Sequence, residues 1–417
     1  MNAPHRNEKI DIDADVLIAG GGLIGTTLAL ALTQGGLRVA VIDANDSAVM
    51  LDTPFDGRVS AVARSSCRLL EALDVWRHLD GDAQPINDIV VSDGTVRSGA
   101  APLFLHFDHR EVGDAPLGHL IENRNLRRAL FVAAQTRSGL DALNGCTVTR
   151  VDTGDAHAVA QLSDGRRARA RVVVCAEGRR ARLREAAGLR TIGWSYRQTG
   201  IVATVHHEKP HHGIAQEFFL PSGPFAILPM TGSRSSLVWT ERSAVASAFM
   251  ALDTPAFEAE VARRFGPYLG ALECAGPRWS YPLSLELALS TVAPRFALVG
   301  DAAHGIHPIA GQGFNLGLRG VAALSEVVVD AARLGLDIGA GDVLERYQRW
   351  RRFDTVALAA ATDVLNRLFS NDIAPLRLMR GAGLAMVGAL APARRYFMRQ
   401  AMGETGALPR LLRGEAI

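Results

Sequence analysis

Residues 15–43 read DVLIAGGGLIGTTLALALTQGGLRVAVID, and this stretch decides the fold. The run over 15–19 is short and largely apolar, which predicts a strand, and residues 26–33 carry apolar side chains at helical density. The pair Gly35-Gly36 ends that helix, and residues 37–43 predict a second strand that finishes in an acid. Strand, glycine-rich turn, helix and strand follow one another in the order of a dinucleotide-binding βαβ unit.

The turn itself is a GxGxxG sequence in which each glycine has a physical role. Gly20 permits the tight turn, Gly22 lets the backbone approach a pyrophosphate, and Gly25 lets helix and strand pack closely. The helix that follows begins near Leu23 and Ile24, where backbone N–H groups without helical partners face an anion. We therefore expect all five residues to bind a dinucleotide, although the same turn also occurs as a purely structural βα connection.

Asp43 closes the second strand and is the acid expected in such a unit. A carboxylate at this point accepts hydrogen bonds from a ribose 2′-hydroxyl and repels a 2′-phosphate. The tightly bound nucleotide is therefore predicted to be FAD or NAD rather than NADP. No second GxGxxG follows in the sequence, which argues against flavoproteins with a separate NAD(P)H domain.

The uncharged run from Val16 to Leu37 is also long enough to cross a bilayer. Its glycines and threonines make it less apolar than a membrane span and break a helix at its start, so we interpret it as the nucleotide-binding turn. The mixed charges before the first apolar run do not resemble a secretory signal. These features predict a cytoplasmic protein.

Composition bounds the remaining choices. A chain of 417 residues with 48% hydrophobic and 21% charged side chains is that of a globular protein with two or three domains. The net charge of +2 gives no overall field for nucleic acid. The four cysteines are scattered without zinc-site spacing, so no metal is predicted.

A second nucleotide element lies near residue 300. The apolar strand predicted over 296–301 ends in Gly300-Asp301, and a glycine-rich turn then opens a helix predicted over 315–333. A carboxylate at the end of a strand can bind a sugar-alcohol hydroxyl. The N–H groups at the start of the helix suit a developing anion, such as the N1 edge of a reduced flavin.

With this element the sequence resembles the single-component FAD aromatic hydroxylases. The glycine turn, Gly300-Asp301 and the run HPIAGQGFNLGLR at 307–319 are similar to those of the UbiH-like ubiquinone-biosynthesis branch (UbiH/UbiF/VisC). The resemblance spans almost the whole chain, and the run at 307–319 is its most specific part. Further matches are Asp56–Ala61, Ile121–Asn123, Gly223–Pro229 and Ala401–Gly403.

The resemblance implies an α/β fold: a Rossmann-like FAD-binding domain, an inserted antiparallel-sheet substrate domain and a C-terminal helical region. It implies an FAD-dependent monooxygenase that hydroxylates a polyprenylated phenol through a flavin C4a-hydroperoxide, with NAD(P)H as reductant and O2 as co-substrate. The implied boundaries are 10–76, 100–190 and 280–345 for the FAD-binding domain, 77–99 and 191–279 for the substrate domain, and 346–417 for the helical region.

The resemblance also assigns roles by position. Asp301 is expected to bind the ribityl chain, while Pro308 and Gly311 are expected beside the reactive C4a face. Arg58 is expected at the FAD phosphates or the flavin, and Asn123 is also expected to bind the cofactor. Gly313, Phe314 and Asn315 are expected to offer N–H groups to the flavin N1/O2 edge.

Three residues depart from the family pattern. A mid-chain Asp-Gly followed by Ser and Arg serves FAD and NAD(P)H in the family, whereas this chain has Glu177 and Ala181 for the acid and the serine and keeps Arg184. The longer side chain moves the carboxylate outward, which puts the interaction with NAD(P)H in doubt. Gly320 likewise stands where the ubiquinone branch usually carries an aspartate.

Between about 190 and 285 short β-rich runs alternate with Pro/Gly turns, which predicts an antiparallel sheet that forms one wall of a substrate pocket. His206-His207 and His211-His212 flank a turn and are not expected to hold a metal. The aromatic and aliphatic side chains of this sheet either line the pocket or belong to the core; the candidates are Phe219, Phe225, Leu228 and Trp239.

The tail from residue 342 onward predicts helices and is rich in arginine. An apolar stretch at 381–393 between basic flanks is too short to span a bilayer and is compatible with contact to anionic lipid at the inner face of the membrane. A solvated helical cap explains the same pattern. The resemblance further implies a quinone-biosynthesis protein complex as a partner. Hydroxylation of a small soluble aromatic and a non-catalytic flavin-binding role are the alternatives to the main hypothesis.

Overall fold

The computed structural model describes residues 9–46, 51, 55–79, 81–95 and 99–417, and it begins with the predicted βαβ unit. β1 (Ile12–Ala19) pairs in parallel with β2 (Val39–Asp43), and α1 (Leu23–Gln34) connects them. The sheet continues in the order β18-β19-β11-β1-β2-β8, with the antiparallel hairpin β9–β10 attached to β11. Its other strands are β8 (Leu140–Asn144), β9 (Val148–Thr153), β10 (Ala158–Leu162), β11 (Arg167–Cys175), β18 (Val292–Ala293) and β19 (Phe296–Leu298).

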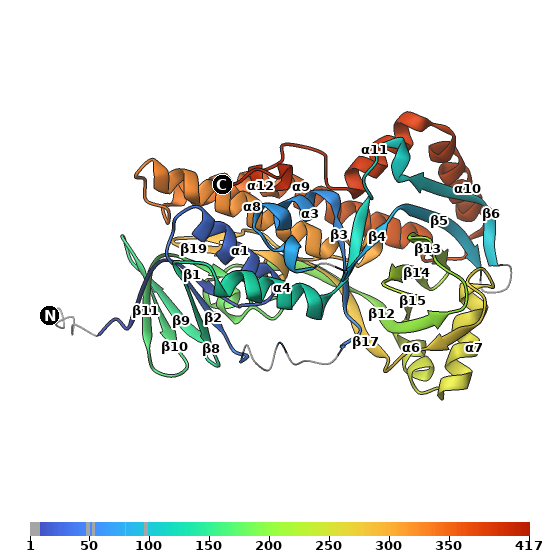
Figure 1. Ribbon diagram of the computed structural model, residues 1–417, viewed down its shortest axis with the longest axis horizontal. Coiled ribbons are helices and arrows are strands. Elements are labelled where there is room, and N and C mark those ends of the chain that lie inside the picture. The colour runs from blue at the N-terminus through green and yellow to red at the C-terminus, as the bar shows by residue number, and fades with distance from the viewer. Residues whose placement is uncertain (1–8, 47–50, 52–54, 80, 96–98) are drawn as a thin grey trace.

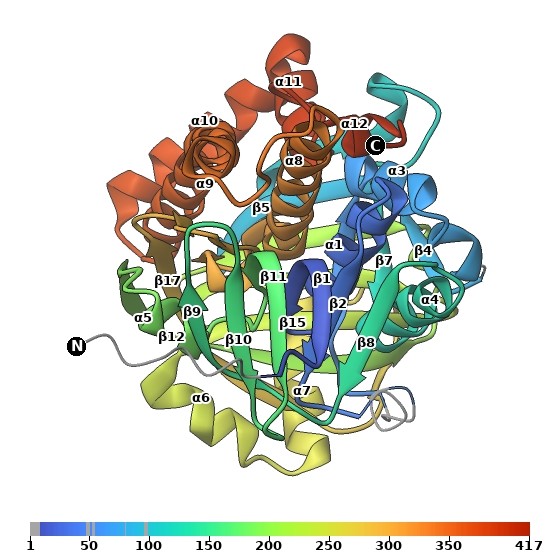
Figure 2. The same ribbon diagram turned by 90° about the vertical axis from the view of Figure 1, so that its left-hand side faces the viewer.

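Helices cover one face of this sheet and bury the largest core of the molecule. α1 is apolar on all sides because it lies between the sheet and α8 (Gln312–Arg333), as Figure 2 shows. The hairpin β9–β10 and α5 (Arg182–Ala186) enclose a second core on the opposite face. The other helices of the first face are α3 (Arg64–Ala72), α4 (Asn123–Gln135) and α12 (Arg410–Arg413).

The second sheet has nine strands in the order β20-β17-β12-β15-β14-β13-β5-β6, with β16 on β12. Helices α6 (Ser243–Met250) and α7 (Thr254–Phe265) cover its outer face (Figure 1). The predicted antiparallel sheet is therefore confirmed. Its strands are β5 (Asp88–Thr95), β6 (Gly99–Asp108), β12 (Thr191–His207), β13 (Ile214–Leu220), β14 (Gly223–Met230), β15 (Arg234–Arg242), β16 (Leu272–Cys274), β17 (Trp279–Ala288) and β20 (His304–Gly305).

A small sheet joins the two units: β3 (Val59–Ala63) and β4 (Ala83–Ile86) both pair with β7 (Gly118–Glu122). Two predicted domain boundaries need correction. Residues 100–108 and 280–288 were assigned to the cofactor domain, but β6 and β17 pair with β5 and β12 in the nine-stranded sheet. β6 and β17 each form an antiparallel pair with a strand of that sheet. Strand pairing decides to which domain a segment belongs, and its position in the sequence does not.

The predicted C-terminal helices are present and contact both units. α9 (Gly341–Phe369) packs on α8, and α10 (Ala374–Ala389) lies against β5 and β6 at the right of Figure 1. α11 (Ala391–Ala401) follows, and α12 returns the chain to α3 and α8. Among the helices that the structure describes, none combines the length and the apolar character that crossing a bilayer requires.

Candidate functional site

The glycine turn after β1 leaves open space where its helix begins. Gly20 has φ +107°, and a Cβ there would lie 2.6 Å from the carbonyl oxygen of Ala176. A Cβ on Gly25 would lie 1.8 Å from the carbonyl oxygen of Gly20, so only glycine lets α1 pack this closely. A Cβ on Gly22 would meet nothing within 4 Å. The space in front of Gly22 at the N-terminus of α1 is therefore open, as the approach of a pyrophosphate requires.

Asp43 lies at the carboxyl end of β2, directly over this turn. Its side chain is buried, and its Oδ2 accepts a hydrogen bond from the N–H of Gly21 at 2.5 Å. Its Oδ1 accepts hydrogen bonds from the backbone and side-chain N–H groups of Asn45. These bonds hold the carboxylate at the position expected for the ribose of a dinucleotide, with one acceptor site of Oδ2 left for a hydroxyl.

The predicted second element follows β19. Asp301 lies in the 3₁₀ turn Gly300–Ala302, and half of its side chain is accessible. Protein atoms still surround the carboxylate, and this desolvation raises its pKa, which the nearby Arg179 guanidinium opposes. An accessible carboxylate held deep in a cleft suits a hydroxyl-bearing ligand such as a ribityl chain.

The start of α8 meets the same cleft. Gly311 precedes the helix with φ +61°, and its N–H donates to the carbonyl of Pro308 at 2.9 Å. A Cβ on Gly313 would meet nothing within 4 Å. The N–H groups of Gly313 and Phe314 belong to the first helical turn and have no partner inside the helix. They can therefore stabilise a negative charge at that point.

The side chain of Asn315 has a structural role, and the expected contact of its N–H with the flavin stays a prediction. α8 begins at Gln312, so Asn315 is its fourth residue, and the helical pattern directs its N–H to the carbonyl of Gly311. Its buried side chain instead joins α8 to β3. The side-chain Oδ1 accepts from the N–H of Ala63 at 2.9 Å, and Nδ2 donates to the carbonyl of Ala61 at 2.8 Å. Asn315 is thus a positioning residue for the first turn.

Ile24 joins the two nucleotide elements. Cβ atoms on Gly300 and Gly317 would lie 3.1 Å and 2.7 Å from its side chain. The glycines of the second element therefore make room for a side chain of the first. Leu23, beside it, packs against the main core. The packing of these two side chains fixes the turn in place, and their expected contact with the cofactor stays a prediction.

Arg58 and Asn123 are neighbours in space, and the contacts of their side chains are with other protein residues. The side chain of Arg58 is 76% exposed, with Asp56 at 3.9 Å. Asn123 begins α4; its N–H donates to the carbonyl of Arg58, and its Oδ1 accepts from Ser60 at 2.7 Å. The expected cofactor contacts of both residues stay predictions.

The two departures at 177 and 181 compensate for each other. Ala181 is the N-cap of α5 and offers no side-chain acceptor, whereas Glu177 Oε2 accepts from the N–H of Leu183 in the first turn of that helix at 3.3 Å. Burial raises the pKa of Glu177. Arg184 ties the helix to the cofactor cleft through the carbonyl of Ala302 and through Glu286. Glu177 therefore performs the capping role that a serine at 181 would perform.

Arg179 is a residue that the sequence analysis missed. Its Nε lies 3.6 Å from Asp301 Oδ2, and its Nη2 donates to the carbonyl of Ile306 at 3.2 Å. The only signal for it was a run of closely spaced arginines from 179 to 184, which does not say which of them turns toward the cleft.

Two of the four candidates for the pocket wall belong to the core, which was the alternative interpretation. Phe225 and Trp239 are fully buried between the outer face of the large sheet and α6 and α7. Side chains alternate along a strand, and these two point away from the cofactor. Phe219 and Leu228 lie on the opposite, inner face, where Phe219 packs against Phe369 of α9 and Leu228 packs near Ala61 of β3.

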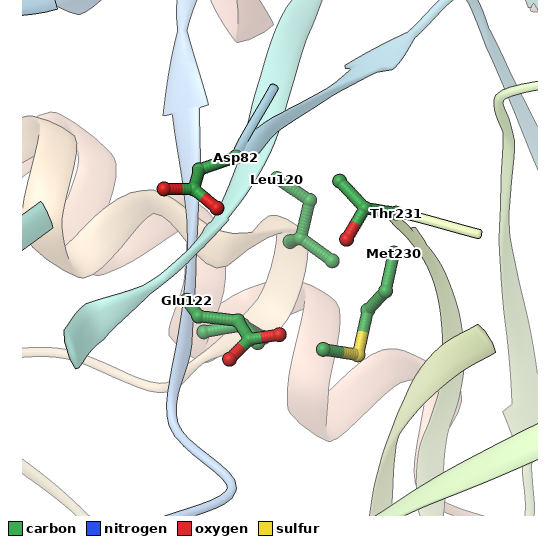
Figure 3. Close-up of a pocket in the computed structure, with 6 residues that line it drawn as sticks. Asp82, Leu120, Glu122, Met230 and Thr231 are labelled. Atoms are coloured by element: carbon green, nitrogen blue, oxygen red, sulfur yellow. The ribbon is translucent and has the colours of Figure 1, made fainter. Parts of the chain in front are cut away.

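Figure 3 shows a hollow where the small sheet meets the β14–β15 hairpin. It is too narrow to hold a water molecule, and the Glu122 carboxylate beside it pairs with Arg124 and Arg234. This hollow is part of the joint between the two units. Its lining residues are Val59, Asp82, Leu120, Glu122, Met230 and Thr231.

The paired histidines stabilise a turn. His207 Nδ1 lies 2.8 Å from the carbonyl of Lys209, and His211 Nε2 lies 2.8 Å from the carbonyl of Met230. Their rings are in edge contact, 5.6 Å between centroids. These bonds give both side chains a structural role.

The residues of the cleft fit FAD. Open space faces the starts of α1 and α8, the buried Asp43 carboxylate lies at the first turn, where a ribose is expected, and the Asp301 carboxylate near the second turn is accessible. Together with the second sheet, this arrangement defines the class: an FAD-dependent monooxygenase fold.

Comparison with known proteins gives the family. A model of the FAD binding domain matches residues 13–352. The chain is 50% identical to the ubiquinone hydroxylase UbiL of Rhodospirillum rubrum, over 96% of this chain and 93% of that protein. It is 32% identical to the 3-demethoxyubiquinol 3-hydroxylase of Escherichia coli, over 93% and 98%. The crystal structure of p-nitrophenol 4-monooxygenase from Pseudomonas putida superposes with a TM-score of 0.78 at 17% identity, covering 95% and 99% of the two chains. The chain belongs to the FAD-dependent hydroxylases of the ubiquinone-biosynthesis group.

Proposed function

We propose that this protein hydroxylates the aromatic ring of a polyprenylated phenol in ubiquinone biosynthesis, with NAD(P)H as the reductant. The observation that carries the proposal is 50% identity to a ubiquinone hydroxylase over nearly the full length of both chains. The cleft supports the proposal. The starts of α1 and α8 and the carboxylates of Asp43 and Asp301 are arranged to bind one dinucleotide, and the nine-stranded sheet lies beside them.

The residues of this chain would bind and orient the cofactor and would keep water away from the reacting ring. The start of α1 and Asp43 would hold the pyrophosphate and ribose, and Asp301 would hold the ribityl chain. When bound, FAD supplies the exchange of electrons with NAD(P)H and O2. The N–H groups of Gly313 and Phe314 would stabilise negative charge on the flavin edge, and Asn315 keeps them in place. The large sheet and α9 would shield the reacting ring from water.

The test is reconstitution. The FAD-loaded protein is given NADPH or NADH and a phenol with one short prenyl chain, and the products are identified by mass spectrometry. A hydroxylated prenylphenol supports the proposal. Turnover only of the matching phenol without a prenyl chain supports hydroxylation of a small soluble aromatic. Bound flavin that neither NADPH nor NADH reduces indicates a non-catalytic flavin-binding role.

The proposal includes contact between the α10–α11 surface and an anionic membrane, from which the prenylated substrate would enter. Five of the tail arginines form ion pairs with acids. Three pair with distant elements, Arg380 with Asp93, Arg394 with Glu111 and Arg410 with Asp330, and two pair locally, Arg377 with Asp372 and Arg413 with Glu415. Arg395 and Arg399 stay exposed with no ion pair to any residue that the structure describes. Large apolar side chains are exposed beside them: Ile373, Met379, Met386, Leu390, Tyr396 and Phe397.

Exposed apolar side chains with flanking arginines match a helical surface that inserts at a lipid interface. Changing Arg395 and Arg399 together to Glu is expected to reduce co-sedimentation with vesicles containing anionic phosphatidylglycerol, by about 1 kcal/mol for each charge. The same change at Arg150 and Arg263, which are exposed on other elements, is the control. Equal co-sedimentation of both variants would remove the membrane contact, and binding to a protein of the pathway without vesicles would assign the surface to a complex.

A further inference from the structure

Glu217 is an isolated acid in the apolar strand β13, and its carboxylate has no hydrogen bond or ion pair with any described residue. Protein atoms surround it, which raises its pKa to about 7. Part of the side chain nevertheless remains accessible. A carboxylate that protein atoms largely surround, that stays partly accessible and that has no partner is open to approach by a ligand that can hydrogen-bond to it.

The strand register places Glu217 on the inner face of the large sheet. It stands beside Val91 of β5 and Ala226 of β14, and the residues two positions away on its own strand are Ala215 and Phe219. Phe218, next to Glu217 in the chain, packs instead with the core under α6 and α7. Because side chains alternate along a strand, Glu217 points away from that core and toward the cofactor side.

The neighbours of Glu217 locate the space in front of it. Ala215 belongs to an apolar cluster against which Ala61 of β3 also packs. Ala61 also meets the flavin-binding turn, because a Cβ on Gly311 would lie 2.9 Å from its own Cβ. On the other side Phe219 stacks on Phe369, with ring centroids 4.1 Å apart. Glu217 thus stands between the turn at Gly311 and the end of α9.

The remaining wall is apolar. Val91 packs against the same apolar cluster as Leu384 and Val387 of α10, the helix that carries the proposed lipid surface. The nearest charged groups that the register places on this inner face are Asp93 and Arg380, which neutralise each other in a buried pair at 3.0 Å. For a prenylphenol that enters along α10, Glu217 would therefore be the carboxylate on this face that has no cationic partner among the described residues.

We infer that Glu217 binds the phenol hydroxyl of the substrate and accepts its proton during ring hydroxylation. This inference rests on the proposed function. The phenolic O–H bond breaks, an O–H bond forms on the Glu217 carboxylate, and the phenol oxygen keeps the electron pair. One negative charge passes from the carboxylate to the ring, which becomes more electron-rich. Electrons and the inserted oxygen come from NAD(P)H and O2, whose second oxygen leaves as water. When the ring regains its aromaticity, the hydroxylated carbon loses its hydrogen as a proton, which is consumed in forming that water, and Glu217 returns its own proton to the phenol oxygen.

The assignment explains why an unpaired acid persists in an apolar wall. A buried carboxyl group without a partner costs stability, and functional sites are where such costs are found. A base that titrates near neutral pH is also suited to general-base catalysis at that pH.

The experiment compares wild-type holoenzyme with Glu217→Gln and Glu217→Asp, using a phenol with one short prenyl chain as the probe. Glu273→Gln, at an exposed position on β16 of the same sheet, is the control. Glu217→Gln is expected to keep its FAD and its reduction by NAD(P)H. We expect its hydroxylation rate to fall by about 10² or more, its yield of product per NAD(P)H to fall, and its Kd for the probe to change by less than about tenfold.

The pH profile separates a base from a structural residue. The wild-type hydroxylation rate is expected to rise as pH increases through about 7, where Glu217 loses its proton, and Glu217→Gln is expected to lose this rise. Glu217→Asp is expected to retain it at a lower rate. Wild-type coupling and an unchanged pH profile in Glu217→Gln would overturn the inference while leaving the proposed function intact. A wild-type enzyme that hydroxylates no phenol would overturn both.

Discussion

Replacing Asn315 by Ala tests how the first turn of α8 is held. The change removes two short hydrogen bonds to the backbone of β3, at 2.9 Å and 2.8 Å. The N–H of Ala63 is buried and would lose its partner. A net hydrogen bond contributes about 1 kcal/mol and an orphaned buried group costs about 1–3 kcal/mol, so we expect the free energy of unfolding to fall by about 2–4 kcal/mol.

The affinity for FAD is expected to fall as well, because the turn that Asn315 anchors carries the N–H groups of Gly313 and Phe314. If about 2 kcal/mol of the loss reaches the cofactor, its Kd rises about 30-fold. Fluorescence titration of the apoprotein with FAD measures this Kd, and urea unfolding followed by circular dichroism measures stability.

Ser325→Ala is the matched control for Asn315→Ala. Ser325 is buried on the same helix, but its hydroxyl bonds only to carbonyls of its own helix, Val321 and Ala322. Its loss is expected to cost under about 1 kcal/mol and to leave FAD affinity unchanged. The reasoning is refuted if Asn315→Ala and Ser325→Ala have the same FAD affinity and the same urea midpoint.

Three further predictions concern the cleft. Gly22→Val is expected to fold but to lose FAD, because the new side chain enters the open space at the start of α1. Gly25→Ala is expected to lower the melting temperature of the apoprotein, because its Cβ would lie 1.8 Å from the carbonyl oxygen of Gly20. Equal melting temperatures of the two apoproteins would contradict this prediction. Asp301→Ala is expected to abolish stable flavin binding during purification, and wild-type flavin content would reject the ribityl assignment. Glu177→Ala is expected to lower the free energy of unfolding by about 1 kcal/mol, because α5 loses its cap, and adding Ala181→Ser is expected to recover part of this loss. Glu177→Asp is expected to keep FAD. A double-mutant cycle without coupling between positions 177 and 181 would reject the inference that Glu177 replaces a serine cap.

The nucleotide-binding half of the fold could be predicted because local sequence rules decide it. Gly20 and Gly25 admit no side chain, Asp43 ends a strand, and Gly300-Asp301 follows another, so each signal is readable without the rest of the chain. The domain boundaries failed at β6 and β17 because strand pairing is a long-range property.

The substrate side could not be predicted as well. A strand's pattern gives two faces but does not say which one a helix covers, and Phe225 and Trp239 lie on the face under α6 and α7. The net charge of the tail overstates its unpaired positive charge for a similar reason. Arg380 and Arg394 form ion pairs with acids that are distant in sequence, Asp93 and Glu111. Glu217 had a readable signal, an acid inside the apolar run of β13, but its meaning depends on the space in front of it.

The central claim is that this cleft binds FAD and inserts one oxygen atom into a prenylated phenol. The most direct measurement is mass spectrometry of the product that purified, FAD-loaded protein forms from a short-chain prenylphenol and NAD(P)H under isotopically labelled O2. The account predicts a product that has gained one labelled oxygen on the ring. An unchanged phenol recovered alongside hydrogen peroxide, or a product whose new oxygen is unlabelled, would contradict it.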